Sequence, residues 1–363
     1  HGCVQTVPGG MVNRITRAAV LTAAAVLSLG ALTACGSNSD DGDSGGEGKT
    51  IALLLPETKT TRYEAFDKPL FEKKMKELCS DCKLNYLNAD QDASKQQQQA
   101  ESALTNGASV LVLDPVDGKA AAGVVKSAQS SDVPVVAYDR FVEGADYYLS
   151  FDNETVGKKQ GEALVEATGD KGEILMLNGA PTDPNAAQFK KGAHSVLDGS
   201  NLKIAAEYDN PDWTPENAQK FTSSQLNKID PGDIAGVYAA NDGQAGGVYA
   251  ALRAAGVKEM PPITGQDAEL AAIQRIVSDQ QYMTIYKPIK VEADKAAETA
   301  VAIVNGDDVT GTTDFQGVKS FIFDPVVVTK DNVKDTVVAD GFYKAADICT
   351  ADYASACADA GVS

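Results

Sequence analysis

Residues 49–55 read Lys-Thr-Ile-Ala-Leu-Leu-Leu, and this stretch decides the fold. A short apolar run without Pro or Gly is typical of a buried β-strand. A loop follows it, and after the loop an amphipathic helical pattern extends to Leu78. Strand, loop and helix in this order are the unit from which helix-covered parallel sheets are built.

The same unit recurs along the chain, in two halves of similar length. Further strands are expected at 83–87, 110–113 and 133–138 in the first half, and at 173–177, 203–208, 236–240 and 262–264 in the second. A helical stretch is expected after each of them. The sequence therefore predicts an α/β protein with two doubly wound, Rossmann-like parallel-sheet domains.

Polar and aromatic side chains gather in the loops that follow these strands. Open parallel sheets bind ligands at the carboxyl ends of their strands, so two facing domains would line one cleft with these loops. Asp and Asn after a strand also commonly cap the next helix, so a single such residue carries little weight. Their matching placement in the two halves favours a site. The candidates are Arg62, Tyr63, Asp114, Asp139, Arg140, Asp183, Asn185, Trp213, Asn241, Asp242, Gln266 and Asp267.

The chemistry of this set favours a polyol ligand. Carboxylates and amide oxygens accept hydrogen bonds from adjacent hydroxyl groups, Arg and Asn donate to them, and an aromatic face packs against apolar C–H groups. A sugar fits this combination better than a free amino acid or a metal ion. No metal and no cofactor are expected.

Composition excludes other classes of function. The chain has 363 residues, 43% of them hydrophobic, which is enough for a sizeable core and about two domains. Its 32 Lys and Arg against 51 Asp and Glu give a net charge of -19, and without a basic face nucleic acid is not an expected partner. The two histidines are His1 and His194, so the sequence gives little support for a hydrolytic triad or a His-rich metal site.

An enzyme of the doubly wound class is the alternative from another class of function. The nearest approach to a dinucleotide motif, Gly243-Gln-Ala-Gly-Gly247, lacks the required glycine spacing, and neither a phosphate loop nor a Gly-x-Ser-x-Gly elbow occurs. His194 lies in a helical stretch and is expected to be a surface or packing residue. The protein is therefore not expected to be an enzyme.

The N-terminus resembles a bacterial lipoprotein signal. A short basic region begins at Met11, an apolar run extends over residues 18–32, and Leu32-Thr-Ala-Cys35 follows. The apolar run has roughly 15 residues, shorter than a membrane span requires. Residues 11–34 are expected to be the signal peptide and Cys35 the lipidated residue, so the protein would be anchored to the outer face of the cell membrane, in the periplasm of a two-membrane cell.

Two segments flank the signal peptide. Residues 1–10 fit no part of a signal and are interpreted as a non-native or misassigned start. Residues 35–48, rich in Gly, Ser and acidic residues, are expected to be a flexible linker rather than a calcium loop.

Four cysteines lie in the body of the chain: Cys79, Cys82, Cys349 and Cys357. An even number in an exported protein favours disulfides over metal binding. The local pairs 79 with 82 and 349 with 357 are the simplest arrangement. A redox role for Cys79-Ser-Asp-Cys82 is the alternative, but this motif follows a helix instead of starting one, where a thiolate would be stabilised.

Eight motifs in the same order resemble the periplasmic sugar-binding proteins of ABC transporters, and most closely the D-xylose-binding and multiple-sugar-binding branch. The likeness covers nearly all of residues 49–345. The motifs are Ala137-Tyr-Asp-Arg140, Ser150-Phe-Asp-Asn-Glu154, Gly179-Ala-Pro-Thr-Asp-Pro-Asn-Ala186, Trp213-Thr-Pro-Glu-Asn-Ala218, Asn241-Asp242, Gly265-Gln-Asp267, Tyr286-Lys-Pro288 and Asp331-Asn-Val-Lys-Asp335.

The resemblance implies a type I periplasmic binding protein fold with a three-strand hinge near Phe151, Tyr286 and Asp324. The first lobe would be 49–151 with 286–323, and the second 152–285 with 324–363. The family has Trp beside the first-loop Arg, where this chain has the smaller Tyr63. The implied sugar ligands are Arg62, Tyr63, Asp139, Arg140, Asp183, Asn185, Trp213, Asn241, Asp267 and Lys287.

The implied function is capture of a monosaccharide, D-xylose or a similar pentose or hexose, by hinge closure and its delivery to an ABC permease. A monomer is expected. A sensor that presents its closed form to a membrane receptor is the alternative with the same fold, because uptake and sensing both use the outer surface of the closed form.

Overall fold

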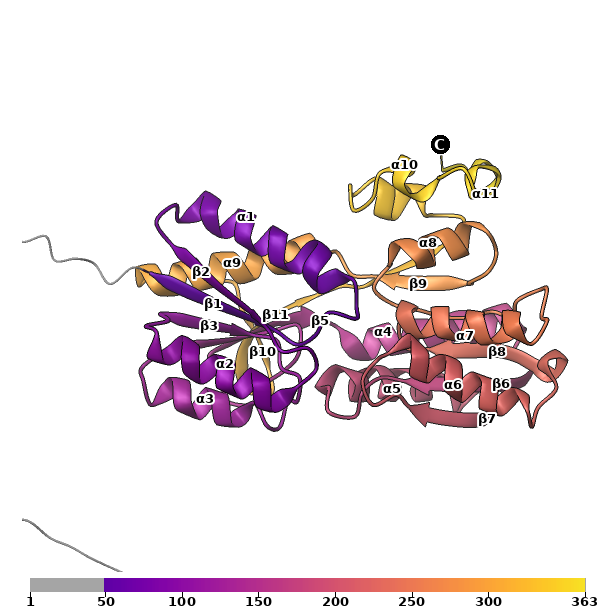
Figure 1. Ribbon diagram of the computed structural model, residues 1–363, viewed down its shortest axis with the longest axis horizontal. Coiled ribbons are helices and arrows are strands. Elements are labelled where there is room, and N and C mark those ends of the chain that lie inside the picture. The colour runs from indigo at the N-terminus through magenta and orange to yellow at the C-terminus, as the bar shows by residue number, and fades with distance from the viewer. Residues whose placement is uncertain (1–48, 363) are drawn as a thin grey trace, which may run out of the picture. The chain divides into compact units, whose positions relative to one another are not determined.

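The computed structural model of the protein describes residues 49–362. Its larger sheet has the strand order β10-β11-β5-β4-β3-β1-β2, and every neighbouring pair is parallel except β10 with β11 (Figure 1). The strands are β1 (Thr50–Leu55), β2 (Lys83–Asn88), β3 (Val110–Leu113), β4 (Val135–Tyr138), β5 (Tyr147–Phe151), β10 (Thr313–Phe315) and β11 (Val318–Phe323).

The continuous apolar run of β1 is explained by helices on both faces of this sheet. Successive strand side chains point to opposite faces. Ile51, Leu53 and Leu55 join one core cluster with α1 (Lys68–Leu78) and α9 (Ile289–Asn305). Ala52 and Leu54 join another with α2 (Ala93–Thr105) and α3 (Ala122–Gln129). Both faces of the strand are therefore apolar, as in parallel sheets generally.

The second parallel sheet has the order β7-β6-β8, and β9 pairs antiparallel with β12 beside it. Its elements are α4 (Asn153–Thr168), β6 (Gly172–Asn178), α5 (Pro184–Leu197), β7 (Leu202–Asp209), α6 (Pro215–Leu226), η2 (Pro231–Asp233), β8 (Ile234–Ala239), α7 (Asp242–Ala254), α8 (Leu270–Val277), β9 (Met283–Tyr286) and β12 (Val326–Thr329).

Two glycines let helices α4 and α5 approach closely. A Cβ on Gly157 would lie 1.9 Å from the carbonyl oxygen of Phe189, and one on Gly192 would lie 2.0 Å from that of Glu154. Both distances are far below van der Waals contact, so only glycine fits at these positions.

Two expectations about the strands were wrong. Residues 262–264 form one isolated bridge, Ile263 with Val237, instead of a strand. The two prolines that precede Ile263 lack N–H groups, so they cannot extend a ladder. The strand ending at Tyr138 is followed by β5 and not by a helix, and α4 comes only after β5.

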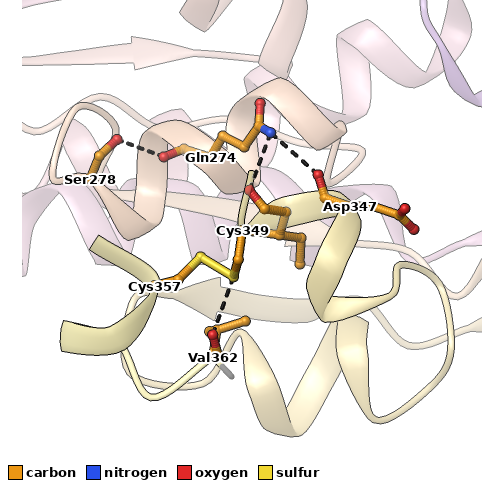
Figure 2. The surroundings of a disulfide bond; sticks show 7 residues. Gln274, Ser278, Asp347, Cys349, Cys357 and Val362 are labelled. Carbon is orange, nitrogen blue, oxygen red and sulfur yellow. Dashed lines mark hydrogen bonds between the residues drawn. A yellow bond between two sulfur atoms is a disulfide. The ribbon is translucent and has the colours of Figure 1, made fainter. Parts of the chain in front are cut away.

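The C-terminal region packs on α8. It contains η3 (Lys334–Val338), α10 (Ala345–Ile348) and α11 (Ala354–Asp359). In the structure Cys349 is bonded to Cys357, and Cys79 to Cys82. Figure 2 shows the first of these disulfides beside α8, where Gln274 Nε2 donates to the carbonyl oxygen of Asp347 at 3.4 Å.

Several expectations concern residues outside the described part of the chain. These are the start segment 1–10, the signal peptide 11–34, the lipidation site Cys35 and the linker up to residue 48. Among residues 49–362 no helix combines the length and apolar character needed to cross a bilayer.

Candidate ligand-binding site

One cavity is lined by side chains from loops of both parallel sheets. The empty space between their atoms, part of which is open to solvent, is about 290 Å³. All ten residues implied as sugar ligands line it, together with Thr60, Phe189 and Gln266. The ten are Arg62, Tyr63, Asp139, Arg140, Asp183, Asn185, Trp213, Asn241, Asp267 and Lys287.

Arg62 is held by three carboxylates. It precedes the single helical turn η1 (Tyr63–Asp67), and its guanidinium lies 2.7 Å from Asp67, 2.9 Å from Asp139 and 2.9 Å from Glu292. All four side chains are buried. Charge-assisted hydrogen bonds of this kind fix the plane of the guanidinium, so Arg62 is oriented before any ligand arrives.

Asp139 is the acceptor at the centre of these cations. Burial alone would raise the pKa of its carboxyl group, but Arg62, Lys287 and Arg140 lower that pKa to about 2. Asp139 is therefore ionised at neutral pH. An ionised carboxylate is a strong acceptor for hydroxyl donors.

Arg140 joins the two sheets across the cavity. Its Nε lies 2.9 Å from Asp183 Oδ2 and 3.5 Å from Asp114 Oδ1, while Nη2 donates to the hydroxyl of Tyr63 at 3.2 Å. Burial raises the pKa of Asp114 well above its usual value and raises that of Asp183, and Arg140 opposes both shifts. Asp114 lies behind Arg140 and not among the lining residues.

Asp183 caps helix α5, and both Asp183 and Asn185 take part in the site. Asp183 accepts from the backbone N–H of Asn185 at 2.8 Å, which caps α5, and from Trp213 Nε1 at 3.2 Å. Asn185 Nδ2 donates to the backbone carbonyl of Asp139 at 3.0 Å. A Cβ on Gly179 would lie 2.0 Å from the Trp213 ring, so this glycine makes room for the indole.

The third loop of the second sheet and the segment after β9 complete the wall. Asn241 caps α7 by accepting from the N–H of Gln244 at 3.0 Å, and Asp242 lies behind it, hydrogen-bonded to Gln281 at 2.8 Å. Lys287 Nζ lies 3.3 Å from Asp267 and 3.7 Å from Asp139.

Three lining residues have left-handed backbone conformations that side-chain-bearing residues seldom adopt. Asp139 has φ 55°, Trp213 64° and Asp267 91°. Such conformations cost about 1–3 kcal/mol each and persist where the surrounding structure imposes them. All three side chains line the cavity.

Two buried side-chain amide oxygens at the cavity make no hydrogen bond within the described part of the chain. They are Asn185 Oδ1 and Gln266 Oε1. An unsatisfied buried acceptor costs about 1–3 kcal/mol. A ligand that carries hydroxyl donors would satisfy them.

Sequence reasoning missed Thr60 and Phe189 as lining residues, and it named Gln266 among the loop candidates but not among the implied sugar ligands. Phe189 lies one and a half turns into α5, where the helical spacing of apolar residues predicts that an aromatic side chain packs in the hydrophobic core. Asp67 and Glu292 were also missed, because their role is to hold Arg62 and they follow no strand. His194 lies on α5 between Asp198 (2.8 Å) and Glu207 (3.3 Å), away from the lining set, as a surface residue would.

A family model described as "Periplasmic binding protein domain" matches residues 51–308. The chain belongs to the periplasmic binding protein family. Membership places this binding protein outside the cytoplasm, and the matched relatives are solute-binding proteins.

Two curated relatives are similar along most of their length. The D-xylose-binding periplasmic protein of Escherichia coli (strain K12) is 37% identical over 312 residues, which cover 82% of this chain and 92% of that protein. The multiple sugar-binding periplasmic receptor ChvE of Rhizobium radiobacter is 31% identical over 285 residues, 70% of this chain and 80% of that protein.

A solved structure supports the same assignment of fold. The ABC transporter solute-binding protein from Clostridium phytofermentans with bound β-D-glucose matches with a TM-score of 0.76 and 27% identity, covering 83% of this chain and all of that one. The predicted α/β fold of two parallel sheets of the type I class is confirmed.

Proposed function

We propose that this protein captures a monosaccharide, D-xylose or a similar pentose or hexose, between two lobes and delivers it to an ABC sugar permease. One observation carries the proposal. The ten candidate ligands come from loops of both parallel sheets and from the segment after β9, and they line a single cavity. The relatives named above are sugar-binding proteins, which supports the class of ligand.

In this proposal the first lobe consists of residues 49–151 and 286–323, and the second lobe consists of residues 152–285 and 324–363. The chain would cross between them at a hinge near Phe151, Tyr286 and Asp324. The contacts from Arg140 to Asp183 and from Asn185 to the carbonyl of Asp139 would then join the lobes in a closed form. A sugar favours closure only by its greater affinity for that form.

The lining favours a neutral, hydroxyl-rich ring. Asp139, Asp183 and the unpaired oxygens of Asn185 and Gln266 are acceptors for hydroxyl groups. Trp213 supplies an apolar ring face at the same wall.

The remaining expectations belong to the same proposal. The protein would act as a monomer, without catalytic activity, and would be held at the outer face of the membrane by a lipid on Cys35. The disulfides Cys79–Cys82 and Cys349–Cys357 would have structural roles.

The test is calorimetric titration of the purified protein with D-xylose, D-glucose, D-galactose, L-arabinose and D-ribose. Micromolar affinity for one of them, about -8 kcal/mol, is expected, with loss of binding in Trp213→Ala. Phe221→Ala is the matched control, because Phe221 stacks on Tyr208 at 4.7 Å and does not line the cavity. Silence with all five sugars would overturn the monosaccharide assignment.

A further inference from the structure

The helical turn that presents Arg62 and Tyr63 is contacted at two points by groups from the second half of the chain. Before it, the backbone N–H of Thr61 donates to Glu269 Oε1 at 3.2 Å. Within the turn, the ring of Phe66 stacks on that of Phe342, with centroids 4.0 Å apart and planes 21° apart.

Phe342 belongs to the C-terminal segment, residues 339–362, which we call the clasp. The clasp is anchored to α8. Gln274 of α8 donates to the carbonyl oxygens of Asp347 and Ile348 at 3.4 and 3.3 Å. The clasp side chains Ile348, Cys357 and Val362 lie in one buried cluster with Ile273, Ile276 and Val277 of α8. The disulfide between Cys349 and Cys357 closes the segment on itself (Figure 2).

The clasp also touches the end of β9, where the chain leaves the two-stranded ladder of β9 and β12. The ring of Tyr286 lies 5.0 Å from that of Phe342, and its hydroxyl donates to Asp340. The ring of Tyr343 packs edge-on against Phe66 at 5.7 Å. Two aromatic side chains of the clasp therefore contact Phe66 in the turn that follows Arg62, and Tyr286 packs on one of them.

We propose that the clasp is a positioning element for sugar binding: by stacking on Phe66 it stabilises the sugar-bound arrangement of the two lobes and holds the turn that presents Arg62 and Tyr63. This inference rests on the proposed function. Neither Phe66 nor Phe342 lines the cavity, so their effect on affinity would act through the residues they hold.

The test is a double-mutant cycle on the stacked pair. Phe66→Ala and Phe342→Ala are each expected to raise the Kd for the bound sugar about fivefold, as expected from the strength of aromatic pairs. The double variant should raise the Kd little further, because both substitutions remove one contact. Phe342→Tyr keeps the ring and should bind within about twofold of the parent.

Two further variants separate this role from loss of stability. Phe221→Ala removes the other stacked pair described above, within the second half, and should leave the Kd unchanged. Cys349→Ala with Cys357→Ala, which opens the clasp, should raise the Kd in the same direction as Phe342→Ala.

Hydrogen exchange of residues 61–68 without sugar gives a second readout. Faster exchange is expected in Phe342→Ala and not in Phe221→Ala. If the parent binds sugar and both single variants keep its Kd, the proposed role of the clasp is overturned, whatever the exchange shows. If the parent binds none of the sugars, that result counts against the proposed function. Hydrogen exchange then tests the role of the clasp by itself, and unchanged exchange in Phe342→Ala overturns that role.

Discussion

Replacement of Arg140 by Gln tests the electrostatics of the cavity. Arg140 is the cation paired with Asp183, at 2.9 Å, and both side chains are 3% exposed. Gln keeps much of the volume and removes the charge. The variant leaves a buried carboxylate without its partner, which typically costs about 3–5 kcal/mol of the free energy of unfolding.

This loss of unfolding free energy should depend on pH, and the pKa of Asp183 sets the direction of the dependence. Burial raises this pKa above its usual value even with Arg140 present, and without Arg140 it should rise further. A carboxyl group with a higher pKa in the folded than in the unfolded state favours folding in its protonated form. Stability of the variant should therefore recover as the pH falls from neutral toward the usual pKa of Asp.

Urea unfolding of parent and variant, near pH 7 and near pH 5, measures the effect. Adding Asp183→Asn to Arg140→Gln should restore part of the loss near pH 7, because an amide carries no charge to leave unpaired. A loss below about 1 kcal/mol near pH 7, or an equal loss at both pH values, would refute the reasoning.

Three further outcomes are expected. Gly179→Ala should weaken sugar binding at least about tenfold by calorimetry, since its Cβ would lie 2.0 Å from the Trp213 ring and displace it; unchanged affinity would contradict this geometry. Gly157→Ala should lower the free energy of unfolding by about 1–3 kcal/mol, whereas Gly123→Ala, with nothing within 4 Å of its Cβ, should raise it by about 0.5–1 kcal/mol. Burial raises the pKa of Glu269 to about 6, so its contribution to stability falls as the pH rises from about 4.5 to about 6, and Glu269→Gln should flatten that part of the pH profile in urea unfolding.

Local patterns in the sequence were enough to predict most of the strands that end at the cavity, but not β9, which ends beside Lys287. The apolar run of β1 reads as a strand covered on both faces, and Asp183 and Asn241 read as residues after strands. Both residues cap a helix and also line the cavity, because the side chain of Asp or Asn has more than one acceptor position. Residues 262–264 are apolar enough to suggest a strand, but the two prolines before Ile263 have no N–H groups for a ladder, and only one isolated bridge forms.

The sequence by itself determined most of the alternation of strands and helices, the loops that carry polar groups, and the class of ligand those groups suit. These depend on periodicity and on residue type, which are local. Only the tertiary structure decided that Glu292 shares Arg62 with Asp67 and that Phe342 stacks on Phe66. Contacts between positions so far apart in the chain are set by how sheets and helices pack, and packing leaves no periodic signal in the sequence around either partner.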